Sequence, residues 1–228
     1  WKQKRLNWHL ALGLGQENYK FHDNEKLAHY ANAAADIEFK FPFGFKELEG
    51  IHSRTDFDLS AHEKFSGRKL QYFDPERNEN YVPYVVETSI GLDRMFLALF
   101  SNCLKDEVLE DGSERTVLSL PPALAPVKAA ILPLVKKDGL PELASKIYDE
   151  LKYDFNVYYE EKDAIGKRYR RQDAIGTPFC ITVDHDSLAD GTVTLRERDT
   201  MKQERVKIED LRKIIDDKVN FRTLLSKI

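Results

Sequence analysis

From residue 128 onward, short apolar segments alternate with amphipathic ones, and this pattern restricts the possible fold more than any other feature of the sequence. The strand-like segments are KAAILPLV, NVYYEE, PFCITVD, TVTLRERD and QERVKI. The helix-like segments are LPELASKIYDELKYD, AIGKRYRRQDAIG and EDLRKIIDDKVNFRTLLSKI. Strands that first alternate with helices and then follow one another predict a small α/β domain with a mixed sheet and flanking helices.

The chain before residue 105 mixes helix-like segments with aromatic-rich extended ones. Residues 24–35 predict a helix with Asn24 as its N-cap, and residues 37–41 then alternate as in a strand. Three further segments continue this pattern, the strands GFKELEGI and YVPYVVETS and the helix LDRMFLALF. This part of the chain is therefore expected to pack helices against extended segments.

A polar segment separates these two parts. Residues 105–115, KDEVLEDGSER, hold five acids against two bases and almost no apolar content. Such a composition predicts a domain boundary or an exposed connection, so we expect domains over residues 1–116 and 117–228. The chain begins with Trp1 rather than Met, inside a helix-like segment without a cap of its own, and we expect that a preceding part of a longer protein is missing.

The composition is that of an ordinary globular protein, with 228 residues of which 42% are hydrophobic and 32% charged. A net charge of -4 leaves nucleic-acid binding to local basic patches. No apolar run approaches the roughly 18 residues of a membrane helix, and Cys103 and Cys180 lack CxxC spacing, so we expect a cytoplasmic protein without membrane contact. The histidines and cysteines show no zinc-ligand spacing, and no zinc site is expected.

Charged residues stand where the strand YVPYVVETS meets the helix LDRMFLALF. In a strand, Glu87 and Ser89 point to the same face, and a carboxylate beside a hydroxyl suits an ammonium group. Gly91 permits close approach of a ligand, and Arg94 offers a planar fork of donors to phosphate or carboxylate. The alternative is a salt bridge between Glu87 and Arg94 at a structural corner.

A second pair of carboxylates lies in the strand GFKELEGI. Glu47 and Glu49 are expected on one face, where burying both would cost several kcal/mol unless a cation is near. Mg²⁺ bound through a carboxylate and substrate phosphates is one such cation. The alternative is that one of the pair faces solvent or Arg54.

A basic run in the second part of the chain is the candidate for RNA contact. KRYRR places Lys167, Arg168, Arg170 and Arg171 around one tyrosine, which suits phosphates and base stacking. Arg196 and Arg198, on a nearby expected strand, are weaker candidates. A solvated helix face is the competing interpretation.

Several separated segments resemble the glycyl-tRNA synthetases of the homodimeric type, which are class II aminoacyl-tRNA synthetases. In the family's order they are LAHYANAAADIEFKFPFGF, KELEGIHSRTDFDL, VPYVVETSIGLDR, APVKAAILPLV, AIGKRYRRQDAIGTPFCITVD and GTVTLRERDTMKQ. The resemblance covers nearly the whole chain. It implies an α/β (α+β) fold in which the C-terminal half of the antiparallel catalytic sheet precedes a small α/β anticodon-binding domain.

The resemblance also implies roles for individual residues, with the family's third motif over residues 87–100. The implied ATP-binding residues are Glu47, Leu48, Gly91, Leu92, Asp93 and Arg94, with Arg94 on the phosphates and Glu47 on the side of an ATP-bound Mg²⁺. The implied glycine-binding residues are Glu87, Thr88, Ser89, Ile90 and Gly91. The family's first motif, which builds the dimer interface, and its second, whose arginine holds the α-phosphate, have no counterpart here.

The implied activity is ATP-dependent activation of glycine to glycyl-adenylate, followed by transfer to tRNA(Gly). This chemistry needs positioning and charge neutralisation rather than a side-chain nucleophile, so no catalytic residue is assigned. The resemblance further implies a homodimer of the intact protein, and it implies that this chain alone is inactive because half of the site is absent.

Two other functions compete with this one. A non-catalytic nucleic-acid-binding protein that reuses the same frame, such as the accessory subunit of a mitochondrial DNA polymerase, would be free to lose the site charges. The presence of Glu47, Glu87, Ser89 and Arg94 argues against it. A synthetase of the same class with another amino-acid specificity is the third possibility, and ETS before IGLDR favours glycine.

Overall fold

The computed structural model describes residues 1–226 and divides into two compact units. The first unit holds Trp1–Leu10 and Leu14–Ser101, and the second holds Ala11–Gly13 and the chain from Asn102 onward. The compact units thus divide at Ser101 and Asn102, before the residue 116 boundary expected from composition. The assignment of separate functions to residues 1–116 and 117–228 stays a prediction.

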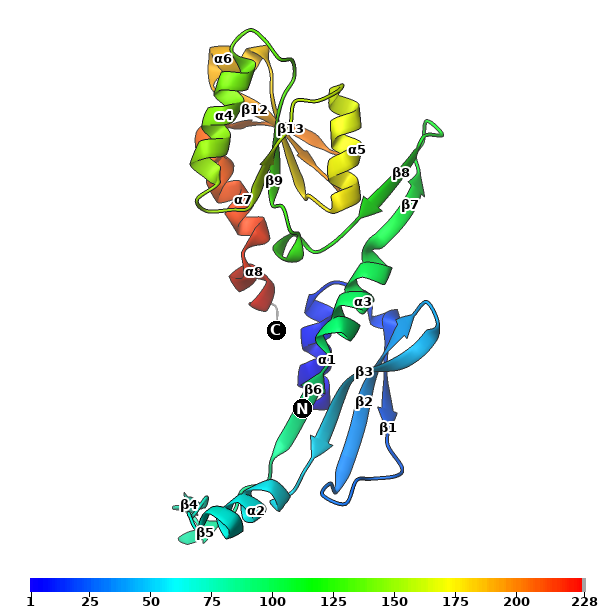
Figure 1. Ribbon diagram of the computed structural model, residues 1–228, viewed down its shortest axis with the longest axis vertical. Helices are drawn as coiled ribbons and strands as arrows, with labels where there is room; N and C mark the ends of the chain where they lie inside the picture. The colour runs from blue at the N-terminus through cyan, green and yellow to red at the C-terminus, as the bar shows by residue number, and fades with distance from the viewer. Residues whose placement is uncertain (227–228) are drawn as a thin grey trace. The chain divides into compact units, whose positions relative to one another are not determined.

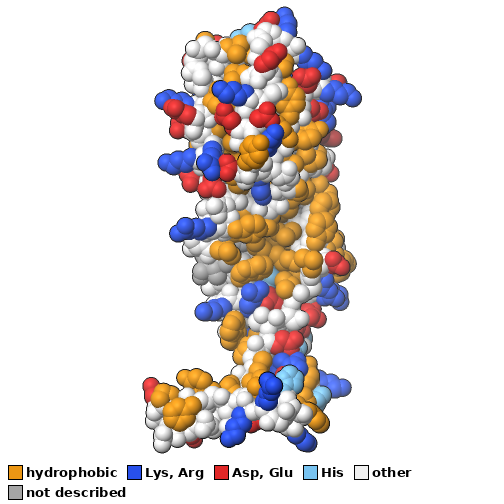
Figure 2. All heavy atoms as spheres, turned by 60° about the vertical axis from the view of Figure 1, so that its left-hand side comes forward, with side chains coloured by type: hydrophobic (Ala, Val, Ile, Leu, Met, Phe, Trp, Pro, Cys, Tyr) orange, Lys and Arg blue, Asp and Glu red, His pale blue; other side chains and the backbone are white. Residues whose placement is uncertain are grey.

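The first unit is built around a four-stranded antiparallel sheet in the order β1-β2-β3-β6 (Figure 1). Its helices are α1 (Lys2–Ala11), α2 (Phe57–Ser66) and α3 (Leu92–Cys103). Its strands are β1 (Tyr19–Asp23), β2 (Ala33–Phe41), β3 (Gly44–Ser53), β4 (Tyr72–Asp74), β5 (Glu79–Tyr81) and β6 (Val86–Ile90). The small hairpin of β4 and β5 follows α2, and Phe65 and Tyr72 are exposed on this α2–β4–β5 segment. Figure 2 shows hydrophobic side chains on the surface of the molecule.

A buried ion cluster joins α1 to the sheet of the first unit. The carboxylate of Glu49 on β3 is 1% exposed, and it accepts hydrogen bonds from Arg5 Nε at 2.5 Å and Arg5 Nη2 at 3.2 Å. Nε2 of His9, which is also buried, lies 2.6 Å from the same carboxylate. Although burial opposes ionisation, these hydrogen bonds from His9 and Arg5 lower the pKa of Glu49.

The second unit contains a five-stranded mixed sheet in the order β10-β9-β11-β12-β13 and a separate hairpin. Its strands are β7 (Leu104–Val108), β8 (Glu114–Leu118), β9 (Ala129–Pro133), β10 (Val157–Tyr159), β11 (Phe179–Val183), β12 (Thr192–Glu197) and β13 (Gln203–Lys207). Its helices are α4 (Leu140–Leu151), α5 (Ile165–Ile175), α6 (His185–Asp190), α7 (Leu211–Val219) and α8 (Phe221–Leu225). β10, β9 and β11 run parallel, and β12 and β13 continue antiparallel.

Helices cover both faces of this sheet, with α4 and α7 on one face and α5 on the other (Figure 1). The larger core lies under α4 and α7, where Ile147 and Ile215 pack against strand residues such as Ile131. Tyr169 of α5 packs over Leu132 on the opposite face. The α/β domain with a mixed sheet and flanking helices, predicted from the alternation of apolar segments, is confirmed.

One local prediction is wrong, and a second segment has more structure than its composition indicates. Residues 24–32 contain no helix, and Ala33 already begins β2, because Ile37 and Phe39 are buried at period 2 between two partner strands. Residues 105–115, expected as a domain boundary or an exposed connection, are mostly exposed and form most of the β7–β8 hairpin, with Glu107 opposite Arg115 and 2.7 Å between their charged groups. This charged cross-strand pair stabilises the hairpin, and a search for apolar alternation does not detect it.

Candidate functional site

The junction of β6 and α3 brings the predicted ammonium-binding residues onto one face of the sheet. Glu87 lies opposite His52 of β3, and Ser89 lies opposite Gly50. Thr88 and Ile90 alternate with them and belong to the other face. The carboxylate and the hydroxyl therefore lie two residues apart on the same side of the sheet, as predicted.

Gly50 lies opposite Ser89 on this face and is itself buried. A Cβ at Gly50 would lie 3.5 Å from Nε2 of His52 and 3.7 Å from Oδ1 of Asp36, so any larger residue would fill the space between those side chains. Polar side chains from β2, β3 and β6 surround this glycine.

Glu87 is paired with Arg54 rather than with Arg94. Nη1 of Arg54 donates to Oε2 of Glu87 at 2.5 Å, and Nδ1 of His52 lies 3.9 Å from the same oxygen. The Glu87 side chain is 36% exposed, so it lies at the surface of the sheet. The alternative of a Glu87–Arg94 salt bridge is therefore wrong, and Arg54 is a residue of this site that the sequence analysis did not select.

Arg94 instead connects α3 to the predicted ATP segment of β3. Its Nη1 donates to the backbone carbonyl of Glu47, and both residues are exposed. Gly91, Leu92 and Asp93 precede Arg94 at the exposed start of α3. Residues from two distant segments predicted to bind ATP therefore meet at one surface, next to the start of a helix, where the backbone favours anions.

Glu47 and Glu49 do not form the side-by-side pair expected from strict alternation. The register of β2 and β3 shifts between Ile37, which lies opposite Glu49, and Glu38, which lies opposite Glu47. Leu48 has no partner in this register and is buried, Glu49 is buried against α1, and Glu47 is exposed. An arginine, Arg5, thus compensates Glu49, while Glu47 is available to a ligand.

Most of the basic residues predicted to bind tRNA make contacts inside the second unit. Arg168 is 2% exposed and donates to the carbonyl oxygens of Pro133, Leu134 and Glu160. Arg198 is buried as well, and it donates to the carbonyl oxygens of Gly176 and Leu120. Their guanidinium groups are used by the fold, and the prediction that they contact tRNA stays a prediction without support from their burial.

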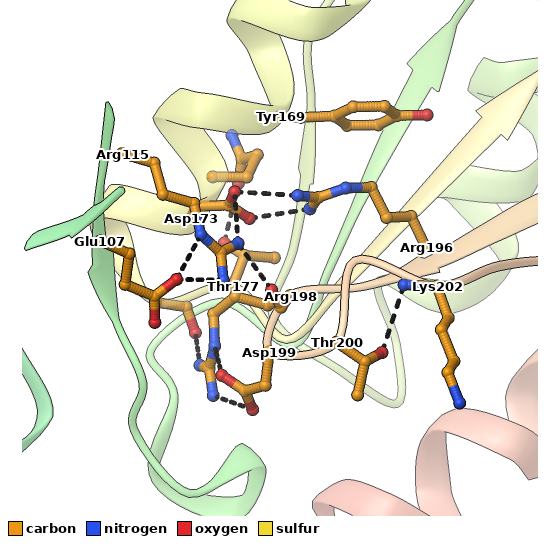
Figure 3. Close-up of polar contacts among 12 residues, drawn as sticks. Glu107, Arg115, Tyr169, Asp173, Thr177, Arg196, Arg198, Asp199, Thr200 and Lys202 are labelled. Atoms are coloured by element: carbon orange, nitrogen blue, oxygen red, sulfur yellow. Dashed lines mark hydrogen bonds and ion pairs between the residues drawn. The ribbon is translucent and has the colours of Figure 1, made fainter. Parts of the chain in front are cut away.

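Asp173 is the centre of a buried ion network in this unit, where it lies between Arg115 and Arg196 (Figure 3). Arg196 donates twice to its carboxylate, at 2.8 and 2.9 Å, and Arg115 donates at 3.2 Å. Arg196 is therefore also engaged inside the unit, and its predicted contact with tRNA stays a prediction without support from its burial. Arg115 is a further member of this network that the sequence analysis did not select. Its position opposite Glu107 in a hairpin is the kind of signal that could have indicated an ion pair there.

The remaining basic residues of α5 lie nearer the surface. Lys167 is exposed, Arg170 is half-buried, and Arg171 is 40% exposed with ion pairs to Glu160 and Asp163. Tyr169 donates to or accepts from the hydroxyl of Thr182 at 2.6 Å. The prediction that Lys167, Arg170 and Arg171 contact tRNA stays a prediction.

Neither cysteine has the surroundings of a reactive thiol. Burial raises the pKa of Cys180 to about 12, and burial also raises the pKa of Cys103. Among residues 1–226 there is no group of three or more histidine, cysteine or acidic side chains placed to hold a metal ion. In the same residues, no helix is long and apolar enough to cross a membrane.

Comparison with known proteins gives a family match within the second unit and similar proteins over most of the chain. Residues 128–218 match the family described as anticodon binding domain. A glycine–tRNA ligase of Chlorobaculum tepidum is 54% identical over 207 residues, which are 90% of this chain and 44% of that protein. Glycine–tRNA ligases of Macrococcus caseolyticus and Geobacillus kaustophilus are 53% and 52% identical over 223 residues, 97% of this chain and 48% of each relative.

The chain is closely similar to the C-terminal portion of glycyl-tRNA synthetases. The resemblance drawn from the separated motifs is thereby confirmed over most of the chain. The chain spans less than half the length of these curated relatives. The alternative of a polymerase accessory subunit is not favoured, because these relatives are named glycine–tRNA ligase.

Proposed function

We propose that the chain forms part of a glycine–tRNA ligase, to which it contributes one side of the amino-acid and ATP site and the anticodon-binding domain. The observation that carries the proposal is the meeting of Arg94 with Glu47 beside the face of Glu87 and Ser89. This arrangement supplies a carboxylate for an ammonium group and a guanidinium for phosphate on neighbouring segments. The similarity to glycine–tRNA ligases supports the same assignment.

In the proposed reaction the carboxylate of glycine attacks the α-phosphate of ATP, which releases pyrophosphate and forms glycyl-adenylate. The terminal ribose hydroxyl of tRNA(Gly) then attacks the glycyl carbonyl, and AMP leaves. Glu87 and Ser89 hold the ammonium group, with Thr88, Ile90 and Gly91 as the surrounding backbone. Arg94 binds the ATP phosphates near Gly91, Leu92 and Asp93, and it neutralises charge as pyrophosphate departs.

The exposed carboxylate of Glu47 fits the Mg²⁺ ion that accompanies ATP, because Mg²⁺ is commonly bound through one or two carboxylates and the substrate phosphates. Leu48, which is buried next to Glu47 in the chain, belongs to the same segment of the proposed ATP site. Specificity for glycine follows from the exclusion of larger amino acids, since glycine has no side chain to recognise.

The wider assignments follow from the same proposal. The second unit binds the anticodon arm of tRNA(Gly), with Lys167, Arg170 and Arg171 as the accessible basic residues of α5. The intact protein works as a cytoplasmic homodimer without zinc.

The test is glycine-dependent exchange of pyrophosphate into ATP. The full-length protein should catalyse this exchange, and the present chain alone should not, because the arginine that holds the α-phosphate in the family has no counterpart in it. Exchange by this chain above background would contradict the division of the site. Full-length protein that exchanges with another amino acid but not with glycine would overturn the proposed specificity.

A further inference from the structure

Arg54 is held from three sides at the end of β3. Its Nη1 donates to Oε2 of Glu87 at 2.5 Å, while its Nε and Nη2 donate to the two carboxylate oxygens of Asp58 at 2.6 and 3.0 Å. Its guanidinium carbon lies 4.0 Å from the centre of the Tyr30 ring. The Arg54 side chain is 22% exposed, so the guanidinium has a defined place between β6, α2 and the loop that carries Tyr30.

The charges of this group do not cancel. Arg54 carries one positive charge, and Glu87 and Asp58 carry one negative charge each. Among residues 1–226, the only other basic side chain within ion-pair distance of Glu87 is His52, at 3.9 Å. The two carboxylates and the single guanidinium together therefore carry one net negative charge, which is the complement of one ammonium group.

The two oxygens of Glu87 differ in their contacts. Oε2 accepts the hydrogen bond from Arg54, whereas Oε1 has no hydrogen-bond partner within the part of the chain that the structure describes. A bidentate Arg54–Glu87 pair would have occupied both oxygens. The fork of Arg54 is instead directed at Asp58, so one oxygen of Glu87 is restrained and the other is available.

We propose that Arg54 is a positioning residue of the amino-acid site, which holds Glu87 through one oxygen so that the other receives the ammonium group of the substrate. This assignment rests on the proposed function. Asp58 is part of the same arrangement for two reasons. It accepts two hydrogen bonds from Arg54, which leaves only one for Glu87, and its negative charge makes the group of three side chains negative overall. A lysine would not replace Arg54, since a point charge lacks the fixed fork that serves two carboxylates at once.

The hydrogen bond to Asp58 is the largest cause that raises the pKa of Arg54, and the hydrogen bond from Arg54 lowers the pKa of Asp58. Both groups are therefore charged throughout the pH range in which a synthetase works. The charges of Arg54 and Asp58 therefore do not change over this pH range.

The experiment compares variants of the full-length protein in glycine-dependent pyrophosphate exchange and in thermal unfolding. Arg54→Gln should raise the KM for glycine by about tenfold to one-hundredfold, as expected when a charge-assisted hydrogen bond is lost, while the KM for ATP changes little. Arg54→Lys should rescue only a small part of this loss. Arg77→Gln is the matched control, because Arg77 is 73% exposed and its ion pairs are long, at 3.8 Å.

Asp58→Asn tests the charge balance separately. It keeps the Arg54–Glu87 hydrogen bond but removes one negative charge, so the KM for glycine should rise again without a matching change for ATP. This variant also carries the test if Arg54→Gln fails to fold. A structural role alone would change kcat and thermal stability but would not select glycine over ATP.

The possible failures are distinguishable. If the wild-type full-length protein shows no exchange with glycine, the proposed function is overturned and this assignment with it. If the wild type is active and both Arg54→Gln and Asp58→Asn keep the normal KM for glycine, only the assignment of Arg54 is overturned.

Discussion

The buried network around Asp173 provides a sharp test of what holds the second unit together. Asp173 is fully buried, and it is the acidic partner of Arg196 among the residues that the structure describes. Although burial opposes the charged form of Arg196, its hydrogen bonds to Asp173 raise the pKa of this guanidinium. Asp173→Asn keeps the shape of the side chain and removes its charge, so Arg196 is left buried without compensation.

Breaking one side of a buried ion pair costs about 3–5 kcal/mol. Arg115 retains Glu107 at 2.7 Å, so most of this cost falls on Arg196. Domains have stabilities of about 5–15 kcal/mol, and the variant should therefore lose a large share of the stability of the second unit. For a domain of this size the melting temperature should fall on the order of 12 °C or more.

The chain allows the two units to be monitored separately. Both tryptophans, Trp1 and Trp8, lie in the first unit, so their fluorescence reports its unfolding, whereas far-UV circular dichroism reports both units. Asp173→Asn should shift the urea midpoint seen by circular dichroism and leave the tryptophan transition in place. Arg171→Gln, which removes partly exposed ion pairs, is the control and should cost about 0–1 kcal/mol. A loss for Asp173→Asn no larger than that of the control would refute the reasoning.

Three further predictions concern the site, the RNA surface and acid stability. In the full-length protein, Arg94→Ala should weaken ATP use by about tenfold to one-hundredfold with little change in thermal stability, and early unfolding with normal exchange would show a purely structural role. Neutral replacement of Lys167 and Arg170 should weaken tRNA binding and reduce its salt dependence, as measured by filter binding at several salt concentrations, without slowing glycine-dependent exchange. Because the folded-state pKa of Glu49 is lowered, its ionised form stabilises the first unit above its ordinary pKa of 4.5, and this contribution is lost as the pH falls through the folded-state value. The tryptophan-detected unfolding free energies of wild type and Glu49→Gln should therefore differ near neutral pH and converge in acid; a constant difference would contradict this.

The sequence by itself determined most of the secondary structure from β9 to α7. Apolar periodicity is a local property, so it identified the strands and helices of the α/β domain and the strand-to-helix junction at Gly91. It also placed Glu87 and Ser89 on one face, because alternation along a strand requires no knowledge of its partners. The helix expected over residues 24–35 shows the limit of this local signal. Its last residues belong instead to β2, which pairs with β1 and β3.

The tertiary structure decided which charges meet. Glu87 is paired with Arg54 rather than with Arg94, and the register shift that buries Glu49 and exposes Glu47 depends on how β3 pairs with β2. Arg168 is a basic residue that no local pattern distinguishes from its neighbour Lys167, yet it is buried because carbonyl groups from distant segments accept its hydrogen bonds. The partner of a long charged side chain is set by packing between segments far apart in the sequence, and short-range periodicity contains no information about it.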